Sequence, residues 1–212
     1  MGKCCHVLRE CAAAARTILP GMSDSVPARR PRTVFLSGPA GSGKTTILQL
    51  THAEKLSTWG RTAAIDTDQL FLMVDPTWDL PYDDARTALV LRQSAQLAKS
   101  FVNADYENVI IAGNSIHDAI DLNPVIPDLL RLGQVFHVTL DPTEEAVLQR
   151  TVDDPDRSPS HLINDRNHHR VKRSPWSAPI DNSTLTPLQT LQKIAHLVQT
   201  GKGEIRGPLP NL

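Results

Sequence analysis

The chain has 212 residues, with 22 Lys or Arg against 23 Asp or Glu, which gives a formal net charge of −1. The length suits one globular domain, and the balanced charge disfavours both a nucleic-acid-binding protein and a polybasic membrane anchor. No apolar run approaches a membrane span, and the three cysteines, Cys4, Cys5 and Cys11, precede the expected domain. We therefore expect a cytoplasmic protein without a disulfide framework, with neither nucleic acid nor membrane as a partner.

The first part of the chain, residues 1–31, is predicted to be a flexible extension outside the fold. Pro20-Gly21 interrupts an alanine-rich stretch, and the residues that follow are polar and include prolines. This composition is typical of a lead-in segment. The folded domain is expected to span residues 32–212.

One segment, residues 38–45 (GPAGSGKT), matches the phosphate-binding pattern G-x-x-x-x-G-K-[ST] at every position. An apolar strand is predicted before it, over residues 33–37, and a helix after it, from Thr46 to about Trp59. In such a loop the backbone N–H groups and the helix N-terminus surround a polyphosphate. Lys44 is expected to face solvent at the loop and to reach the β- and γ-phosphates, and the Thr45 hydroxyl would bind Mg²⁺. The predicted nucleotide contacts are Gly38, Ala40, Gly41, Ser42, Gly43, Lys44, Thr45 and Thr46.

Further strands are predicted over residues 62–65, 109–112 and 135–140, with a short edge strand over 178–180. Their continuous apolar runs are typical of parallel strands that are covered on both faces. Between them, an amphipathic helix is predicted over residues 83–104. Asp141 and Thr186 are predicted to cap two later helices. This alternation predicts a three-layer α/β domain with a parallel sheet.

A second chemical site is expected at Asp66-Thr67-Asp68, where the second strand ends. Ligands of open α/β sheets bind at this edge. Because alternate residues of an extended segment point to different sides, one carboxylate can face Mg²⁺ through water and the other an acceptor hydroxyl. The alternative is a pair of acids that cap the helical-looking segment after Asp68.

The phosphate loop, the paired aspartates and the arginine-bearing region after the fourth strand together resemble the shikimate kinase-like small-molecule kinases, a group that includes chloramphenicol phosphotransferase. The resemblance covers roughly residues 33–200. It implies a P-loop NTPase fold with a five-stranded parallel sheet in the order 2-3-1-4-5. It also implies a lid at about residues 153–170, an adenine-stacking Arg150, a lid arginine at Arg157, a substrate-binding Arg173 and an adenine-side loop at Asp181-Asn182.

The chain departs from that group around the predicted acceptor site. Ala112-Gly113-Asn114 stands in place of a triple glycine, and Leu91-Arg92 is the nearest counterpart of a phenylalanine–arginine pair. Trp78, in a proline-rich loop, is predicted either to shape the acceptor pocket or to pack as ordinary core. The predicted acceptor contacts are Asp68, Trp78, Arg92, Gly113, Asn114 and Arg173.

The third strand ends without the aspartate that many P-loop ATPases use for Mg²⁺, so this role is assigned to Asp66. Arg166 and Arg170 are interpreted as solvated charges.

The predicted function is transfer of the γ-phosphoryl group of ATP, with Mg²⁺, to a hydroxyl of a small molecule. Lys44 and Arg157 would stabilise the transferring group, and Asp68 would act as the base. Three alternatives stay open: a nucleoside or nucleotide kinase, a kinase of nucleic-acid ends, and an ATP-binding switch protein in which Asp68 serves no acceptor.

Overall fold

A computed structural model describes residues 30–52, 59–76, 84–114, 116, 119–152, 159–172 and 175–210. Its sheet has five parallel strands in the order β2-β3-β1-β4-β5, as predicted. These strands are β1 (Arg32–Ser37), β2 (Thr62–Asp66), β3 (Asn108–Ala112), β4 (Gln134–Leu140) and β5 (Ala178–Ile180). A short strand that was not predicted, β6 (Glu204–Ile205), pairs antiparallel with the start of β4.

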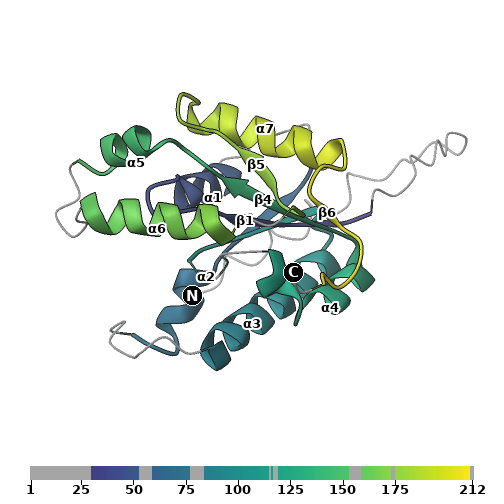
Figure 1. Cartoon of the computed structure of the whole chain (residues 1–212). Helices are drawn as coiled ribbons and strands as arrows, with labels where there is room; N and C mark the ends of the chain where they lie inside the picture. Colours follow the sequence, from purple (N-terminus) through teal and green to yellow (C-terminus); the bar gives the residue numbers. More distant parts are fainter. Residues whose placement is uncertain are drawn as a thin grey trace, which may run out of the picture.

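The helices cover both faces of this sheet, which gives the predicted three layers (Figure 1). Within the described part of the chain, no helix is both long and apolar enough to cross a membrane. The helices are α1 (Lys44–His52), α2 (Thr67–Leu72), α3 (Asp84–Asn103), α4 (Ile126–Leu132), α5 (Glu144–Arg150), α6 (Pro159–Lys172) and α7 (Pro187–Gln199), with a 3₁₀ turn at Ala119–Leu122.

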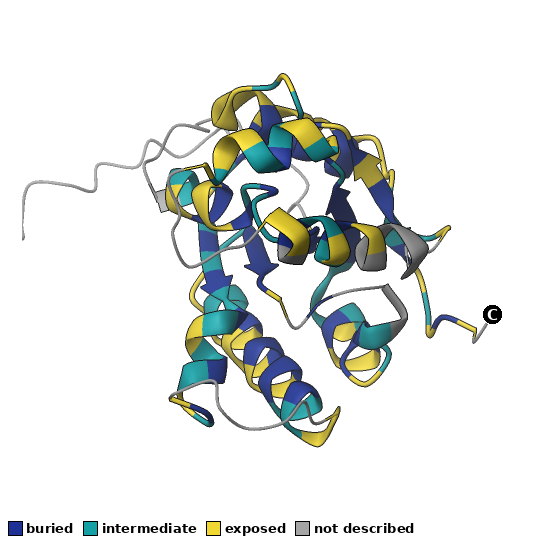
Figure 2. Ribbon diagram, turned by 60° about the vertical axis from the view of Figure 1, so that its left-hand side comes forward, coloured by how far each residue is buried: buried dark blue, intermediate teal, exposed yellow. Residues whose placement is uncertain are grey.

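The core consists of two apolar clusters, one on each face of the sheet, and Figure 2 shows the buried strands between the partly exposed helices. Val34 and Leu36 of β1 belong to the cluster that α1 and α7 cover. Phe35, between them, belongs to the cluster that α3 and α4 cover. Because successive residues of a strand point to opposite faces, this division explains why β1 is apolar at consecutive positions. Burial of both faces holds the carboxyl ends of the strands in register.

The two predicted helix caps had different outcomes. Thr186 caps α7 in a capping box with Gln189, as predicted. The cap of α5 is Thr143, whose hydroxyl accepts from the Ala146 amide at 3.3 Å, and the prediction of Asp141 was wrong. The reason is that the Asp141 amide donates to the Ile180 carbonyl at 2.8 Å. This bond keeps Asp141 in the extended β4–β5 pairing, and α5 begins three residues later, at Glu144.

The region expected as a polar lid is helical from Pro159 onwards, and residues 153–158 lie outside the described part. Arg166 is only 8% exposed, and its Nε donates to the Pro142 carbonyl at 3.0 Å, so its interpretation as a solvated charge was wrong. Leu162, one helical turn earlier, is also buried. These two residues give α6 an inward-facing stripe that its polar composition conceals.

The first helix also differs from its prediction, because it begins inside the phosphate loop at Lys44. Residues 53–58 lie outside the described part, and Trp59, where the helix was expected to end, is fully buried in a turn. Residues 1–29 lie outside the described part as well, so the flexible extension stays a prediction.

A histidine is buried inside β4. His137 is 1% exposed, and neither ring nitrogen has a hydrogen-bond partner in the described part of the protein. Burial lowers the pKa of His137 from 6.5 to about 3, because the charged imidazolium would be desolvated. Below pH 6.5 the unfolded chain therefore takes up a proton that the folded chain refuses. The stability that this site contributes is complete above that pH and is lost as the pH falls towards 3.

We expect the free energy of unfolding to fall by about 1.4 kcal/mol per pH unit below 6.5 because of His137. His137→Leu should remove this slope, while His196→Gln, at an exposed position of α7, should retain it. Urea unfolding at several pH values between neutral and mildly acidic measures the slopes. An unchanged slope in His137→Leu would contradict the expectation.

Candidate active site

The phosphate loop follows β1, the central strand, and therefore lies in the middle of the carboxyl edge of the sheet. A cavity of about 610 Å³ opens at this edge, within the size range of small-molecule sites. Most of the predicted nucleotide contacts line it, together with two of the predicted acceptor contacts: Ala40, Gly41, Ser42, Gly43, Lys44, Thr45, Thr46, Arg150, Asp68 and Asn114. The structure therefore places the loop, the Asp68 carboxylate and Arg150 around one cavity.

The loop needs its first glycine for two physical reasons. Gly38 has φ 141°, which side-chain-bearing residues rarely adopt. A Cβ at this position would also lie 2.6 Å from the Leu140 carbonyl oxygen at the end of β4. The glycine therefore lets the loop leave β1 close against its neighbouring strand. Gly38 does not line the cavity itself, but its carbonyl oxygen takes part in the loop's hydrogen bonds.

Lys44, the first residue of α1, is more enclosed than the sequence suggested. It is 7% exposed, and its Nζ donates to the carbonyl oxygens of Gly38 at 2.6 Å and Pro39 at 3.2 Å. The expectation that this side chain faces solvent was wrong, because the loop wraps around its ammonium group. The next residue, Thr45, is exposed at the cavity wall. The loop thus holds a positive charge at the place where phosphates would lie.

The two aspartates after β2 are in different environments. Asp66 caps α2, since its Oδ1 accepts from the Asp68 amide at 2.9 Å, and it does not line the cavity. Asp68 lines the cavity, and its Oδ1 accepts from the Asn114 amide at 2.7 Å. The alternative interpretation of the pair as helix caps therefore describes Asp66 but not Asp68. The metal role of Asp66 stays a prediction.

Gly113 permits this approach of β3 to α2. It has φ 153°, and a Cβ there would lie 2.0 Å from Thr67 Oγ1 and 2.8 Å from Asp68 Oδ1. A side chain at position 113 would therefore push Asp68 away from the Asn114 amide. Gly113 is better described as positioning Asp68 than as a residue that itself lines the cavity.

The opposite side of the cavity is built around Arg150, at the end of α5. Its guanidinium donates to the carbonyl oxygens of Asn182 at 2.5 Å and Ser42 at 3.4 Å. Asn182 is buried, and its Nδ2 donates to the same Ser42 carbonyl at 2.9 Å. Burial lowers the pKa of Arg150, while the nearby Asp181 carboxylate opposes that change. Arg150 thus ties the phosphate loop to the loop before α7.

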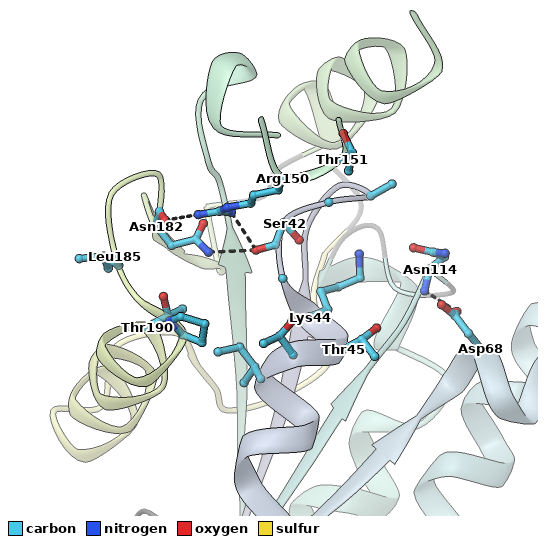
Figure 3. A pocket seen from close by; sticks show the side chains of 16 residues that line it. Ser42, Lys44, Thr45, Asp68, Asn114, Arg150, Thr151, Asn182, Leu185 and Thr190 are labelled. Atoms are coloured by element: carbon cyan, nitrogen blue, oxygen red, sulfur yellow. Dashed lines mark hydrogen bonds between the residues drawn. The ribbon is translucent and has the colours of Figure 1, made fainter. Parts of the chain in front are cut away.

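Figure 3 shows the resulting arrangement, with Arg150, Asn182, Leu185 and Thr190 on one side, Asp68 and Asn114 on the other, and Lys44 and Thr45 between them. Five of the lining residues were not among the contacts predicted from the sequence: Ile47, Thr151, Leu185, Pro187 and Thr190. The capping box at Thr186 could have indicated Pro187 and Thr190, because it begins α7 only a few residues after the predicted adenine-side loop at Asp181-Asn182.

Comparison with known proteins bears on this arrangement. No protein-family model matches the chain, and no curated protein matches its sequence. Solved structures do match. A sugar kinase from Janibacter sp. HTCC2649 superposes with a TM-score of 0.55 at 20% identity, covering 80% of this chain and 95% of that one. The chain has the fold of P-loop kinases.

Two further structures agree with this. Shikimate kinase from Acinetobacter baumannii, in complex with shikimate, superposes with a TM-score of 0.53 at 21% identity, covering 82% of this chain and 96% of that one. A tunicamycin resistance protein from Deinococcus radiodurans superposes with a TM-score of 0.54 at 19% identity, covering 84% of this chain and 99% of that one. The resemblance to shikimate kinase-like proteins is thus confirmed for the fold.

Of the remaining predicted acceptor contacts, Arg92 and Gly113 lie in the described part of the chain, and neither lines the cavity. Arg92 lies on the exposed side of α3, next to the buried Leu91, and does not line the cavity. Leu91-Arg92 was the expected counterpart of a phenylalanine–arginine pair. In the structure Arg86 of α3 lies near a phenylalanine, with its guanidinium 5.9 Å from the centre of the Phe71 ring. It also forms an ion pair with the buried Asp75 at 3.3 Å. Trp78, Arg157 and Arg173 lie outside the described residues, so their roles stay predictions.

Proposed function

We propose that this protein transfers the γ-phosphoryl group of ATP to a hydroxyl group of a small molecule. The observation that carries the proposal is that the phosphate loop and the Asp68 carboxylate line one cavity of about 610 Å³. A phosphate-binding loop by itself supports only nucleotide binding. A carboxylate held across the same cavity supplies what an acceptor hydroxyl needs, namely a group that orients it and accepts its proton.

The loop residues support the nucleotide half of this function. Lys44 would leave its contacts with the Gly38 and Pro39 carbonyls, or share them, to neutralise the β- and γ-phosphates. Arg150 and Asn182 would hold the nucleoside side, next to the apolar surface of Leu185 and Pro187. We also propose that Arg157, in the lid region, supplies a second positive charge that stabilises the transferring phosphoryl group.

The donor set is suitable for Mg²⁺. The proposed ligands are hard oxygen donors: the Thr45 hydroxyl, which lines the cavity, and the Asp66 carboxylate, at the end of β2. In the described part of the chain, no cluster of three or more His, Cys, Asp or Glu forms a metal cage. That pattern fits an ion held largely through phosphate oxygens. When bound, Mg²⁺ would offset negative charge on the β- and γ-phosphates.

Asp68 would act on the acceptor. The Asn114 amide holds one carboxylate oxygen at 2.7 Å, which fixes the direction of the group without neutralising its charge. A hydroxyl placed between Asp68 and the γ-phosphate would be oriented for attack and would lose its proton to the carboxylate. Trp78 and Arg173 are proposed to complete the acceptor pocket.

A screen for acceptor-dependent ADP formation tests this function. Purified protein, ATP and Mg²⁺ are incubated with sugar acids, cyclitols, nucleosides and hydroxyl-bearing natural products, and each product is confirmed by a mass increase of one phosphoryl group. We expect phosphorylation of a non-nucleoside alcohol. A nucleoside product would favour the nucleoside-kinase alternative. Nucleotide binding without any phosphorylated product would favour the switch-protein alternative.

A further inference from the structure

A carboxylate from α6 already lies on the phosphate loop. Asp165 Oδ2 accepts a hydrogen bond from the backbone amide of Ala40 at 2.6 Å, although the two residues are 125 positions apart in the chain. Ala40 belongs to the predicted phosphate contacts and lines the cavity. At 2.6 Å the bond is shorter than an ordinary amide–carbonyl hydrogen bond, and charged groups shorten hydrogen bonds in this direction.

Amides of such loops are donors for anions. The glycine-rich turn directs successive N–H groups towards the position of a polyphosphate, so each amide has affinity for a negatively charged oxygen. At Ala40 that donor is engaged by a carboxylate of the same chain. A terminal phosphate that approached the loop would meet both an occupied donor and a like charge.

Helix α6 is anchored beside this contact. The residue after Asp165, Arg166, is buried and donates to the Pro142 carbonyl at 3.0 Å, while Leu162 is buried one turn earlier. The Asp165 carboxylate is therefore presented to the loop by a helix that packs against α5. Withdrawal of the carboxylate requires either a change of rotamer or a shift of α6.

We propose that Asp165 competes with the terminal phosphate of the nucleotide for the loop, so that triphosphate binding displaces this carboxylate and loosens α6. This inference rests on the nucleotide binding proposed above. It gives Asp165 a regulatory role, because the carboxylate lowers affinity for triphosphates selectively and couples the position of α6 to the phosphate site. A nucleotide without β- and γ-phosphates has no such competitor.

The test compares Asp165→Asn with the wild-type chain by calorimetric titration with AMPPNP, ADP and AMP in the presence of Mg²⁺. We expect Asp165→Asn to bind AMPPNP about 10-fold more tightly at low ionic strength, ADP by a smaller factor, and AMP equally. Hydrogen exchange supplies a second measurement. AMPPNP should speed amide exchange over residues 159–172 in the wild-type chain but change it less in the variant.

Asp105→Asn is the matched control, since it removes the same charge at an exposed position beyond α3, before the amino end of β3. Its φ of 62° also suits asparagine. This variant should bind all three nucleotides like the wild type. Equal or weaker AMPPNP binding by Asp165→Asn would overturn the competition and make the carboxylate a brace for the loop. Failure of the wild-type chain to bind AMPPNP would overturn the proposed function itself.

Discussion

Lys44→Ala is expected to lower acceptor-dependent ADP formation by about 10³-fold, near the upper range for loss of one donor that stabilises a transition state. The ammonium group is held at the loop by the Gly38 and Pro39 carbonyls, so its position is fixed before a phosphate arrives. Without it, no neighbouring cation of the loop can replace the charge, because Lys44 is the single basic residue of the motif.

This substitution should also affect the fold slightly. Removing the ammonium leaves two carbonyl oxygens without their donor, which we expect to cost about 1 kcal/mol, since water in the cavity can replace part of the contact. Thermal unfolding separates this cost from the loss of turnover. Lys99→Ala, at an exposed position on α3, removes the same charge and should change neither quantity. Near-normal turnover by Lys44→Ala would mean that the chain is not a phosphotransferase of this type.

Most of the sheet could be predicted from the sequence, because its strands are buried on both faces. Burial of consecutive residues demands consecutive apolar side chains, and this gave the positions of β1 and β4 to within a residue. The loop at residues 38–45 could also be located from the sequence, since its motif prescribes fixed residue types at fixed spacings.

The parts that sequence analysis missed depend on contacts between distant segments. Strand β6 has two residues and pairs with Val135 and Phe136 of β4, so no local pattern indicates it. The cap of α5 moved to Thr143 because Asp141 was engaged by β5. Helix α6 has a polar sequence, and its anchor Arg166 resembles a surface residue until Pro142 is placed beside it.

The same reason limits the prediction of the site. Asp66 and Asp68 were correctly placed at the carboxyl edge of the sheet. Their spacing of two residues along one segment does not reveal, however, which of the two carboxylates faces the cavity. The Asn114 amide decides this by holding Asp68, and that amide arrives from the neighbouring strand. The contact between Asp165 and Ala40 could likewise not be predicted from the sequence, because the two residues are 125 positions apart in the chain.

Asp68→Asn is expected to leave Mg²⁺-ATP affinity nearly unchanged and to lower turnover by about 10²–10⁴-fold, the usual range for loss of a general base. Asparagine keeps the size of the side chain and an oxygen that can accept from the Asn114 amide, so the local geometry should survive. The loss would fall at the low end of the range if the transition state is loose, because the attacking oxygen then needs little deprotonation.

Asp66→Asn is the informative partner of this variant, because asparagine caps a helix as well as aspartate does. The α2 cap at the Asp68 amide should therefore persist, while the charge assigned to the metal is lost. We expect a higher Mg²⁺ concentration for half-maximal turnover in Asp66→Asn and an unchanged Mg²⁺ requirement in Asp68→Asn. Calorimetric ATP titrations across Mg²⁺ concentrations, together with turnover of the identified acceptor, measure both.

The two variants separate a kinase from a nucleotide-binding protein, because only an acceptor site makes the pair fail in different ways. Loss of turnover with intact ATP binding in Asp68→Asn assigns that carboxylate to the acceptor. Normal turnover in the same variant would reduce Asp68 to a brace that joins α2 to Asn114, and the acceptor would then have to be oriented by other residues. If the Mg²⁺ concentration for half-maximal turnover rises in both variants, both carboxylates bind the metal. Asp68 would then face Mg²⁺ rather than the acceptor hydroxyl.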